Sequence, residues 1–172
     1  MPDHFRIEPL GKHHDRAAFS CGKGSLDEYL KNQAGQAVGK NLAAVFILTP
    51  DGKKIAGYYT LSSYAVQLDE IPEEIGKKLT RMREVPATLL GRLARSVEFR
   101  GQGIGGALLV DALKRAVRNR EQVASCAVIV DAIDEEATEF YKRYGFLPFP
   151  NQPNRLFLPM SSVEKMFLEQ PR

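Results

Sequence analysis

Residues 97–109 read VEFRGQGIGGALL, a glycine-rich loop followed directly by a strongly periodic helical segment. A β-rich run, Thr88 to Val97, leads into the loop, in which glycines alternate with Gln102 and Ile104. Glycine adopts backbone conformations that side chains forbid, and a helix start adds unpaired N–H groups and the positive end of the helix dipole. The stretch therefore predicts a phosphate cradle for a ligand that carries a pyrophosphate.

Three kinds of phosphate-binding loop have to be distinguished by the glycine spacing. Gly101, Gly103 and Gly106 match the dinucleotide-binding pattern G-x-G-x-x-G, and Asp131 ends a later strand where a ribose-binding acid could lie. A Rossmann sheet normally opens with this motif, however, and only about two strands have room to follow it here. A P-loop is excluded because no Gly-Lys-Ser/Thr follows. The pattern that remains is Arg-x-x-Gly-x-Gly, from Arg100 to Gly105, with a plain glycine turn as the alternative.

The composition is that of an ordinary globular chain. Its 172 residues (19.2 kDa) are 44% hydrophobic and 26% charged, so we expect one domain that spans residues 1–172. No apolar run approaches the ~18 residues of a membrane span, and the first four residues lack a signal-peptide pattern. These features predict a cytoplasmic protein.

Cysteine and histidine give little support to a metal site. Cys21 and Cys126 lie far apart, which fits two buried thiols better than a disulfide framework or a metal pair. His4, His13 and His14 are the histidines of the chain, and all lie in its first tenth. We therefore expect no metal, and catalysis by groups other than a histidine triad or a zinc ion.

Positive charge is concentrated before the glycine loop. The whole chain has a net charge of +3 and a pI of about 8.9, but residues 77–100 hold seven basic side chains against two acidic ones, a net charge of +5. The basic residues are Lys77, Lys78, Arg81, Arg83, Arg92, Arg95 and Arg100. A polyanionic partner larger than a cofactor and a solvated basic face explain this charge equally well.

Hydrophobic periodicity and turn signals predict a mixed α/β fold. The predicted elements are a helix from Ser25 to Gly39, antiparallel strands Ala43–Thr49 and Ile55–Val66, a short helix Pro72–Thr80, a strand Ala87–Val97, a helix Ile104–Asn119, a strand Cys126–Ala132, a helix Glu135–Arg143, and a strand Arg155–Pro159 before a closing helix. Ser25-x-x-Glu28 and Ser161-x-x-Glu164 have the spacing of capping boxes, and Gly145 is placed to cap the helix before it. The strands on either side of Ile104–Asn119 should form a right-handed parallel crossover.

A second motif lies at residues 137–146, ATEFYKRYGF. It resembles the Phe-Tyr-x-x-x-Gly-Phe pattern of motif B in the GNAT family of N-acetyltransferases, and Arg100–Gly105 resembles motif A of the same family. The two motifs stand in the family's order and at its usual distance. The resemblance implies the GNAT fold, a central, mostly antiparallel sheet with a β-α-β acetyl-CoA-binding crossover and flanking helices, and it implies acetyl-CoA as co-substrate.

Further segments resemble one branch of that family, the acetyltransferase toxins of type II toxin–antitoxin modules. These segments are Phe19–Gly22, Leu26–Leu30, Gly57–Leu61, Leu90–Ala94 and Asn154–Pro159, within about residues 19–160. The resemblance implies acetylation of the α-amine of aminoacyl-tRNA, arrest of translation, a ribbon-helix-helix antitoxin as partner, and a homodimer. One departure concerns the pattern Leu-Ala-Val-Asp before the loop, which is Leu93-Ala94-Arg95-Ser96 here. If Arg95 faces the cleft, the amino acid accepted could change.

The resemblance also assigns roles to single residues. Tyr141 matches the tyrosine that reaches the CoA sulfur and acts as general acid, with an aromatic residue that merely closes a helix as the alternative. The expected cofactor-binding residues are Leu93, Ala94, Arg95, Arg100, Gly101, Gln102, Gly103, Ile104, Gly105, Gly106, Asp134 and Phe140. The expected tRNA-binding residues are Lys77, Lys78, Arg81, Arg83 and Arg92.

The expected chemistry is transfer of an acetyl group from a thioester to an amine. In the family's fold, pantetheine lies along the strand that carries Leu93–Val97 like an added strand, and an amide near Leu93–Arg95 polarises the acetyl oxygen. Tyr141 then protonates the thiolate, because a free phenol has a pKa of about 10. We expect water or no base to suffice for the weakly basic α-amine. Two alternatives remain, a GNAT enzyme that acetylates a small-molecule amine or a protein lysine, and a non-catalytic acyl-CoA-binding module.

Overall fold

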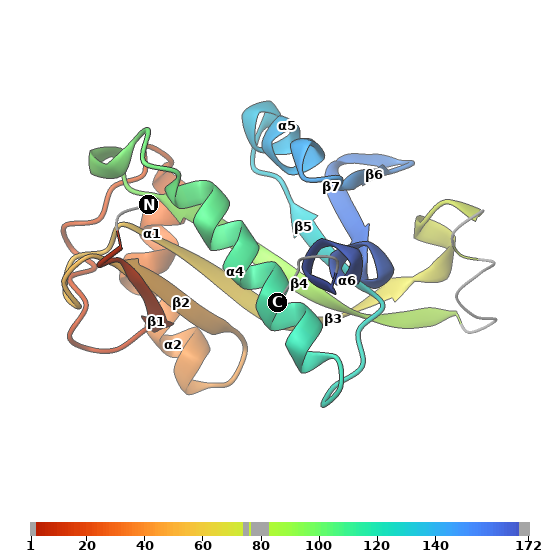
Figure 1. Ribbon diagram of the computed structural model, residues 1–172, viewed down its shortest axis with the longest axis horizontal. Helices are drawn as coiled ribbons and strands as arrows, with labels where there is room; N and C mark the ends of the chain where they lie inside the picture. Colours follow the sequence, from red (N-terminus) through yellow and green to blue (C-terminus); the bar gives the residue numbers. More distant parts are fainter. Residues whose placement is uncertain (1–2, 74–75, 77–82, 169–172) are drawn as a thin grey trace. The chain divides into compact units, whose positions relative to one another are not determined.

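The computed structural model describes residues 3–73, 76 and 83–168 (Figure 1). Its strands are β1 (Arg6–Pro9), β2 (Ala44–Thr49), β3 (Gly57–Gln67), β4 (Glu84–Arg95), β5 (Ala127–Asp131), β6 (Leu147–Phe149) and β7 (Gln152–Pro159). Its helices are α1 (Gly24–Asn32), α2 (Ala34–Gly39), α4 (Ile104–Asn119), α5 (Glu135–Arg143) and α6 (Met160–Leu168), with short 3₁₀ helices η1 (Leu68–Glu70) and η2 (Val97–Phe99). The strands form a 7-stranded sheet in the order β1-β2-β3-β4-β5-β7-β6.

The sheet is mixed, as the sequence predicts. β4 and β5 run parallel, whereas the pairs β1–β2, β2–β3, β5–β7 and β6–β7 are antiparallel. Helices connect and flank these strands (Figure 1). The predicted fold class, a mostly antiparallel sheet with a parallel β-α-β connection, is confirmed.

Two compact units make up the chain. Unit 1 contains residues 1–62 and 91–112, and unit 2 contains residues 63–90 and 113–172. Strands β3 and β4 and helix α4 contribute residues to both units. Each unit has an apolar core of its own. The single domain expected over residues 1–172 stays a prediction.

Unit 1 is built on the predicted hairpin of β2 and β3. The two strands pair in antiparallel register, with Ala44 opposite Leu61 and Leu48 opposite Gly57. Strand β1, which the sequence did not reveal, pairs with the other edge of β2. The hairpin, the two short helices, β4 and the loop before α1 contribute the buried core residues Phe19, Tyr29, Leu30, Ala34, Val45, Ile47, Ile55, Tyr58 and Ala94.

The single helix predicted from Ser25 to Gly39 is wrong. The segment is broken at Gln33 (φ −121°, ψ −32°) into α1 and α2, because packing of Leu30 and Ala34, both fully buried, overrides local helix propensity. The first capping box is wrong as well, since α1 begins at Gly24 and Ser25 lies inside it.

Unit 2 contains the paired part of the parallel connection and helix α5. Thr88–Leu90 of β4 pair with Val128–Val130 of β5 in parallel register. Helices α4 and α5 have the bounds that the sequence predicts. After α5, Gly145 (φ 93°) donates its N–H to the Lys142 carbonyl and Phe146 donates to the Tyr141 carbonyl, at 3.0 and 3.3 Å. This pair of bonds is a Schellman motif and confirms the glycine cap.

Several other boundaries differ from the prediction. The last strand begins at Gln152 and pairs with β6, which was not predicted. Proline is unfavourable in most strands, but an edge strand such as β6 tolerates it. Helix α6 begins at Met160, so the second capping box is wrong, and Glu164 instead accepts a hydrogen bond from Arg120 (2.8 Å).

The strand predicted through Val97 ends at Arg95, and residues 97–99 form η2. The predicted helix Pro72–Thr80 lies largely outside the described residues. Within the described ranges, no helix combines the length and the apolar character needed to cross a bilayer.

A carboxylate shared by two histidines holds the loop after β1. His14, whose side chain is fully buried, accepts the Gly11 N–H at Nδ1 (2.9 Å), so its proton lies on Nε2 and is donated to Glu8 Oε1 (2.7 Å). The exposed His13 ring reaches the same oxygen at 3.1 Å, and Arg6 reaches the other carboxylate oxygen at 2.8 Å. Hydrogen bonds from Arg6 first, and then from the two histidines, lower the pKa of Glu8 from 4.5 to about 2. The Glu8 carboxylate thus pairs with both histidines and with Arg6, and the cluster acts as a structural clamp on this loop.

We expect Glu8→Gln to reduce stability in a pH-dependent way. The folded pKa of Glu8 lies below its unfolded value, so its contribution is complete above about pH 5 and is lost as the pH falls from 4.5 toward 2. Chemical denaturation of both proteins between pH 7 and pH 2.5 measures the difference in unfolding free energy, expected at about 1–2 kcal/mol at pH 7. A difference that stays constant down to pH 2.5 would contradict this account.

Candidate active site

The glycine loop lies in unit 1, between η2 and α4. Gly101 and Gly103 have φ angles of 80° and 74°, in the left-handed region that favours glycine. A Cβ atom added at either position would have no atom within 4 Å. Backbone conformation, not crowding, therefore requires glycine here, and the space above the loop is open to a ligand.

Backbone N–H groups at the start of α4 are available to an anion. The first of them with a backbone acceptor is that of Ala107, which donates to the Gly103 carbonyl at 3.1 Å. Among the described residues, no protein acceptor is found for the N–H groups of Gly103, Ile104, Gly105 and Gly106. The dipole of this 16-residue helix adds to the attraction. Such a set of donors fits a pyrophosphate group.

Close contact with β3 fixes the position of the first turn of α4. A Cβ atom on Gly57 would lie 2.8 Å from Leu108 Cδ1, 3.0 Å from Ile104 Cγ2 and 2.8 Å from the Ala94 carbonyl oxygen. Ile104 and Leu108 are fully buried. The helix therefore rests directly on the strand, and only glycine at position 57 leaves room for it.

Backbone hydrogen bonds also fix the segment before the loop. The Ser96 N–H donates to the Ala56 carbonyl and the Val97 N–H to the Ser20 carbonyl, both at 2.8 Å. Ser96 is buried, and its hydroxyl oxygen accepts the Glu98 N–H at 3.3 Å, which caps η2. This role of Ser96 was not predicted, although a serine before a short helical turn is a recognisable capping signal.

The β4 residues expected to contact the cofactor lie in unit 1 as well. Ala94 is buried in the unit 1 core, whereas Leu93 and Arg95 are half-buried. The parallel ladder of β4 ends at Leu90, so these three residues lie beyond it. The structure thus brings the β4 residues and the loop residues Arg100–Gly106 together in one unit.

Tyr141 lies in unit 2 on α5, with its ring buried between Phe140 and Phe146 at centroid distances of 5.3 and 5.5 Å. Its hydroxyl has no protein partner among the described residues. Among the described residues, two side-chain polar atoms are both sealed from solvent and without a partner, Glu70 Oε2 and Arg95 Nε. The Tyr141 hydroxyl is not one of them, so it is not sealed from solvent. Burial raises the pKa of Tyr141 above that of a free phenol. The group is a neutral donor at physiological pH and a weaker acid than the sequence analysis assumed.

Two other residues expected at the cofactor have structural roles in unit 2. The Asp134 carboxylate caps α5 by accepting the Ala137 N–H at 2.8 Å. The Phe140 ring packs against Tyr141 and Tyr144, each at 5.3 Å. Together with the Schellman motif after Tyr144, these contacts fix both ends of the helix that carries Tyr141.

The predicted tRNA-binding residues are only partly described. Lys77, Lys78 and Arg81 lie outside the described residues, and Arg83 is exposed in unit 2. In unit 1 the guanidinium carbon of Arg92 lies 3.6 Å from the centroid of the buried Tyr29 ring. Stacking holds the planar guanidinium in one orientation and leaves its N–H edges for an anionic partner.

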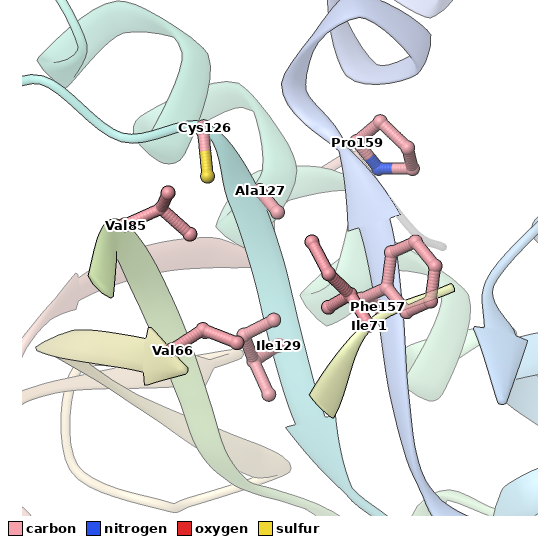
Figure 2. A pocket seen from close by; sticks show the side chains of 8 residues that line it. All are labelled: Val66, Ile71, Val85, Cys126, Ala127, Ile129, Phe157 and Pro159. Atoms are coloured by element: carbon pink, nitrogen blue, oxygen red, sulfur yellow. The ribbon is translucent and has the colours of Figure 1, made fainter. Parts of the chain in front are cut away.

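A small cavity in unit 2 lacks the groups that catalysis needs (Figure 2). Its lining is apolar apart from one thiol and consists of Val66, Ile71, Val85, Cys126, Ala127, Ile129, Phe157 and Pro159. Burial raises the pKa of Cys126, as it raises that of Cys21 to about 11, so both thiols are protonated and poorly nucleophilic. Both cysteines are free and half-buried, where full burial was expected.

The sequence analysis also missed a polar cluster that joins three strands of unit 2. Arg155 on β7 donates to both carboxylate oxygens of Asp131 on β5, at 2.8 and 3.1 Å, and to the Tyr64 hydroxyl on β3, at 2.5 Å. No local pattern links residues so far apart in the chain. Arg155 therefore holds both oxygens of the Asp131 carboxylate within this cluster.

Comparison with known proteins places these features in a family. Residues 41–148 match the model of the acetyltransferase (GNAT) domain. The chain is 32% identical over 169 residues to the probable toxin TacT of Sinorhizobium fredii, covering 93% of both chains. It is also 32% identical over 152 residues to the tRNA-acetylating toxin of Mycobacterium tuberculosis, covering 88% of this chain and 90% of the relative.

Solved structures agree in fold. The structure of AtaT complexed with acetyl-methionyl-tRNAfMet has a TM-score of 0.87 and 28% identity, covering 95% of this chain and 99% of AtaT. A tyrosine-to-phenylalanine mutant of AtaT, bound to the C-terminus of the antitoxin AtaR and to acetyl-CoA, has a TM-score of 0.82 and 28% identity. It covers 97% of this chain and 100% of the other.

Substitutions at Tyr141 should separate the ring from the hydroxyl. Tyr141→Phe removes an oxygen without a protein partner, so we expect its unfolding free energy to stay within about 0.5 kcal/mol of the parent value, whereas Tyr141→Ala should lose about 3–5 kcal/mol. Tyr58→Phe is the matched control, because the buried Tyr58 hydroxyl donates to the Leu26 carbonyl at 2.6 Å. Its loss should cost about 1–2 kcal/mol in urea denaturation. Equal costs for the two Phe variants would show that the Tyr141 hydroxyl has a partner within the fold.

Proposed function

The chain belongs to the GNAT family of acetyltransferases, and from this we propose that it acetylates the α-amine of aminoacyl-tRNA with acetyl-CoA and thereby blocks translation. The observation that carries the proposal is the open glycine loop with free N–H groups at the start of α4. It is the binding site that the pyrophosphate of acetyl-CoA requires.

The residues present fit the diphosphate and the pantetheine arm of acetyl-CoA. Gly101 and Gly103 open the backbone toward the diphosphate, and the N–H groups from Gly103 to Gly106 are its donors. The backbone of Leu93–Arg95, beyond the parallel ladder, is the place where pantetheine adds like a short strand. When bound, acetyl-CoA supplies the activated acetyl group as a thioester.

The chain's own residues then have three tasks in the transfer. The β4 backbone holds the thioester, which turns a bimolecular reaction into one between positioned groups. A backbone N–H near Leu93–Arg95 stabilises the negative charge that develops on the acetyl oxygen. As the amine nitrogen bonds to the carbonyl carbon and the C–S bond breaks, Tyr141 donates its proton to the sulfur, and the amine proton leaves to water. The raised pKa of Tyr141 keeps this proton in place until the thiolate forms.

The acceptor is argued from the relatives and from charge. Two relatives are a tRNA-acetylating toxin and a toxin solved with acetyl-methionyl-tRNA. Residues 77–100 of this chain carry the net charge of +5, and Arg92 presents an oriented guanidinium. Basic residues of this kind suit the phosphates of an RNA acceptor better than a small amine or a protein lysine.

The proposed partner is an antitoxin whose C-terminal tail neutralises these basic residues. The relative AtaT is bound by the C-terminus of its antitoxin. We infer a ribbon-helix-helix antitoxin with an acidic tail for this chain, since an acidic segment that folds on binding complements the same basic residues. We also infer a homodimer, which sedimentation of the purified protein tests.

Gly103→Glu should abolish the binding of acetyl-CoA. A side chain at φ 74° strains the loop, and a carboxylate in the cradle repels the diphosphate. Gly39→Glu is the control, because position 39 also has open space around it but no left-handed backbone. In a thermal shift assay, acetyl-CoA should raise the melting temperature of the parent and of Gly39→Glu. It should leave the melting temperature of Gly103→Glu unchanged. Equal stabilisation of all three would place the diphosphate elsewhere.

Acetylation of charged tRNA tests the proposed acceptor. Purified protein with labelled acetyl-CoA should label aminoacyl-tRNA but neither uncharged tRNA nor a lysine peptide, and it should stop cell-free translation. Tyr141→Phe should bind acetyl-CoA with unchanged affinity and turn over about 10²–10⁴-fold more slowly, the usual contribution of a positioned acid. Labelling of the lysine peptide with none on charged tRNA would favour the alternative acceptor class.

A further inference from the structure

Arg95 has a buried nitrogen that no group in the protein satisfies. Its Nε atom is enclosed and has no hydrogen-bond partner, and no ion pair with Arg95 is found within the described residues. An enclosed N–H without an acceptor costs free energy, all the more when it belongs to a charged group. In native structures such atoms call for an explanation, and a ligand is one.

Strand geometry tells which face of the sheet Arg95 occupies. Its neighbour Ala94 packs in the unit 1 core, and Arg92 stacks on Tyr29 of α1. Successive side chains of a strand point to opposite faces, so Arg95 points away from Tyr29 and α1. The opposite face of unit 1 is the one against which α4 packs, since Gly57 faces Leu108 there.

The hydrogen-bond register locates Arg95 along α4. The Leu68 N–H donates to the Arg83 carbonyl and the Ser96 N–H to the Ala56 carbonyl, so the neighbouring strands β3 and β4 run antiparallel. Because the Ala56 N–H donates to Leu48 and not to Ser96, Arg95 lies opposite Gly57. The Cβ position of Gly57 lies 3.0 Å from Ile104, the first residue of α4. Arg95 is therefore beside the first helical turn, next to the unpartnered N–H groups of the glycine loop.

We propose that the Arg95 guanidinium is a side-chain ligand of the acetyl-CoA diphosphate, a contact that adds to the backbone cradle and rests on the proposed function. The diphosphate supplies what Arg95 lacks, an anionic acceptor on the α4 face of β4. A guanidinium binds phosphate oxygens with two parallel, charge-assisted hydrogen bonds. The valine usual at this place in the toxin pattern has no such capacity.

The role explains why a charged side chain persists in a half-buried position. Without ligand, the enclosed Nε–H is an unfavourable feature of the fold. With ligand, the terminal N–H groups of the same guanidinium, which are not among the enclosed atoms, face a negative charge. Arg95 thus lowers the stability of the free protein and raises its affinity for acetyl-CoA.

Calorimetry on three full-length proteins tests the proposal, namely the parent, Arg95→Val and the control Arg118→Val, which removes an exposed arginine near the end of α4. The parent and Arg118→Val should bind acetyl-CoA equally, whereas Arg95→Val should bind it about 10–100-fold more weakly. Relative to Arg118→Val, Arg95→Val should lose far more kcat/KM with acetyl-CoA than with acetyl-pantetheine, the donor that lacks the diphosphate. The unfolding temperature of Arg95→Val without ligand should equal or exceed that of the parent.

The possible outcomes distinguish a failure of the proposed function from a failure of the proposed role of Arg95. If the parent itself does not bind acetyl-CoA, the proposed function fails. If the parent binds but Arg95→Val binds as tightly, Arg95 is not a diphosphate ligand. A parallel loss with acetyl-pantetheine also overturns the proposal, because it places the contact on pantetheine or on the fold. Should Arg95→Val not fold, Arg95→Met keeps the aliphatic stem and carries the same comparison.

Discussion

The contact between Gly57 and the first turn of α4 is the constraint on which the glycine loop depends. A single missing Cβ atom lets the helix rest on β3, with Ile104 and Leu108 fully buried. The helix start, with its free N–H groups, then lies at the end of β4 beside Arg95. Ligand binding in unit 1 is thus a product of close packing, since the donors are held in place by apolar side chains beneath them.

Much of this arrangement could be read from residues 97–109. Glycines at left-handed positions, followed at once by a helix of period 3.6, have few physical explanations, and both the loop and α4 formed where expected. Helix α5 and its Gly145 cap were predictable for the same reason, because a polar start, an apolar face and a C-terminal glycine are all local signals. Signals carried by residues close together in the chain do not depend on tertiary contacts, so they predict the local structure correctly.

Features that depend on distant residues were not predictable. The helix breaks at Gln33, between the fully buried Leu30 and Ala34, and both predicted capping boxes are wrong because the helices begin one residue earlier, at Gly24 and Met160. The Tyr64–Asp131–Arg155 cluster requires three strands to be adjacent. The unsatisfied Nε of Arg95 is invisible in sequence, where the residue is only an unexpected arginine.

The unpartnered hydroxyl of Tyr141 is dispensable for the fold. No contact within the described residues depends on that oxygen, and the ring packs against Phe140 and Phe146. A Tyr141→Phe chain should therefore keep the backbone and the packing of the parent. A protein partner that recognises the folded chain then binds both forms alike, so the substitution separates recognition of the fold from the chemistry proposed for the hydroxyl.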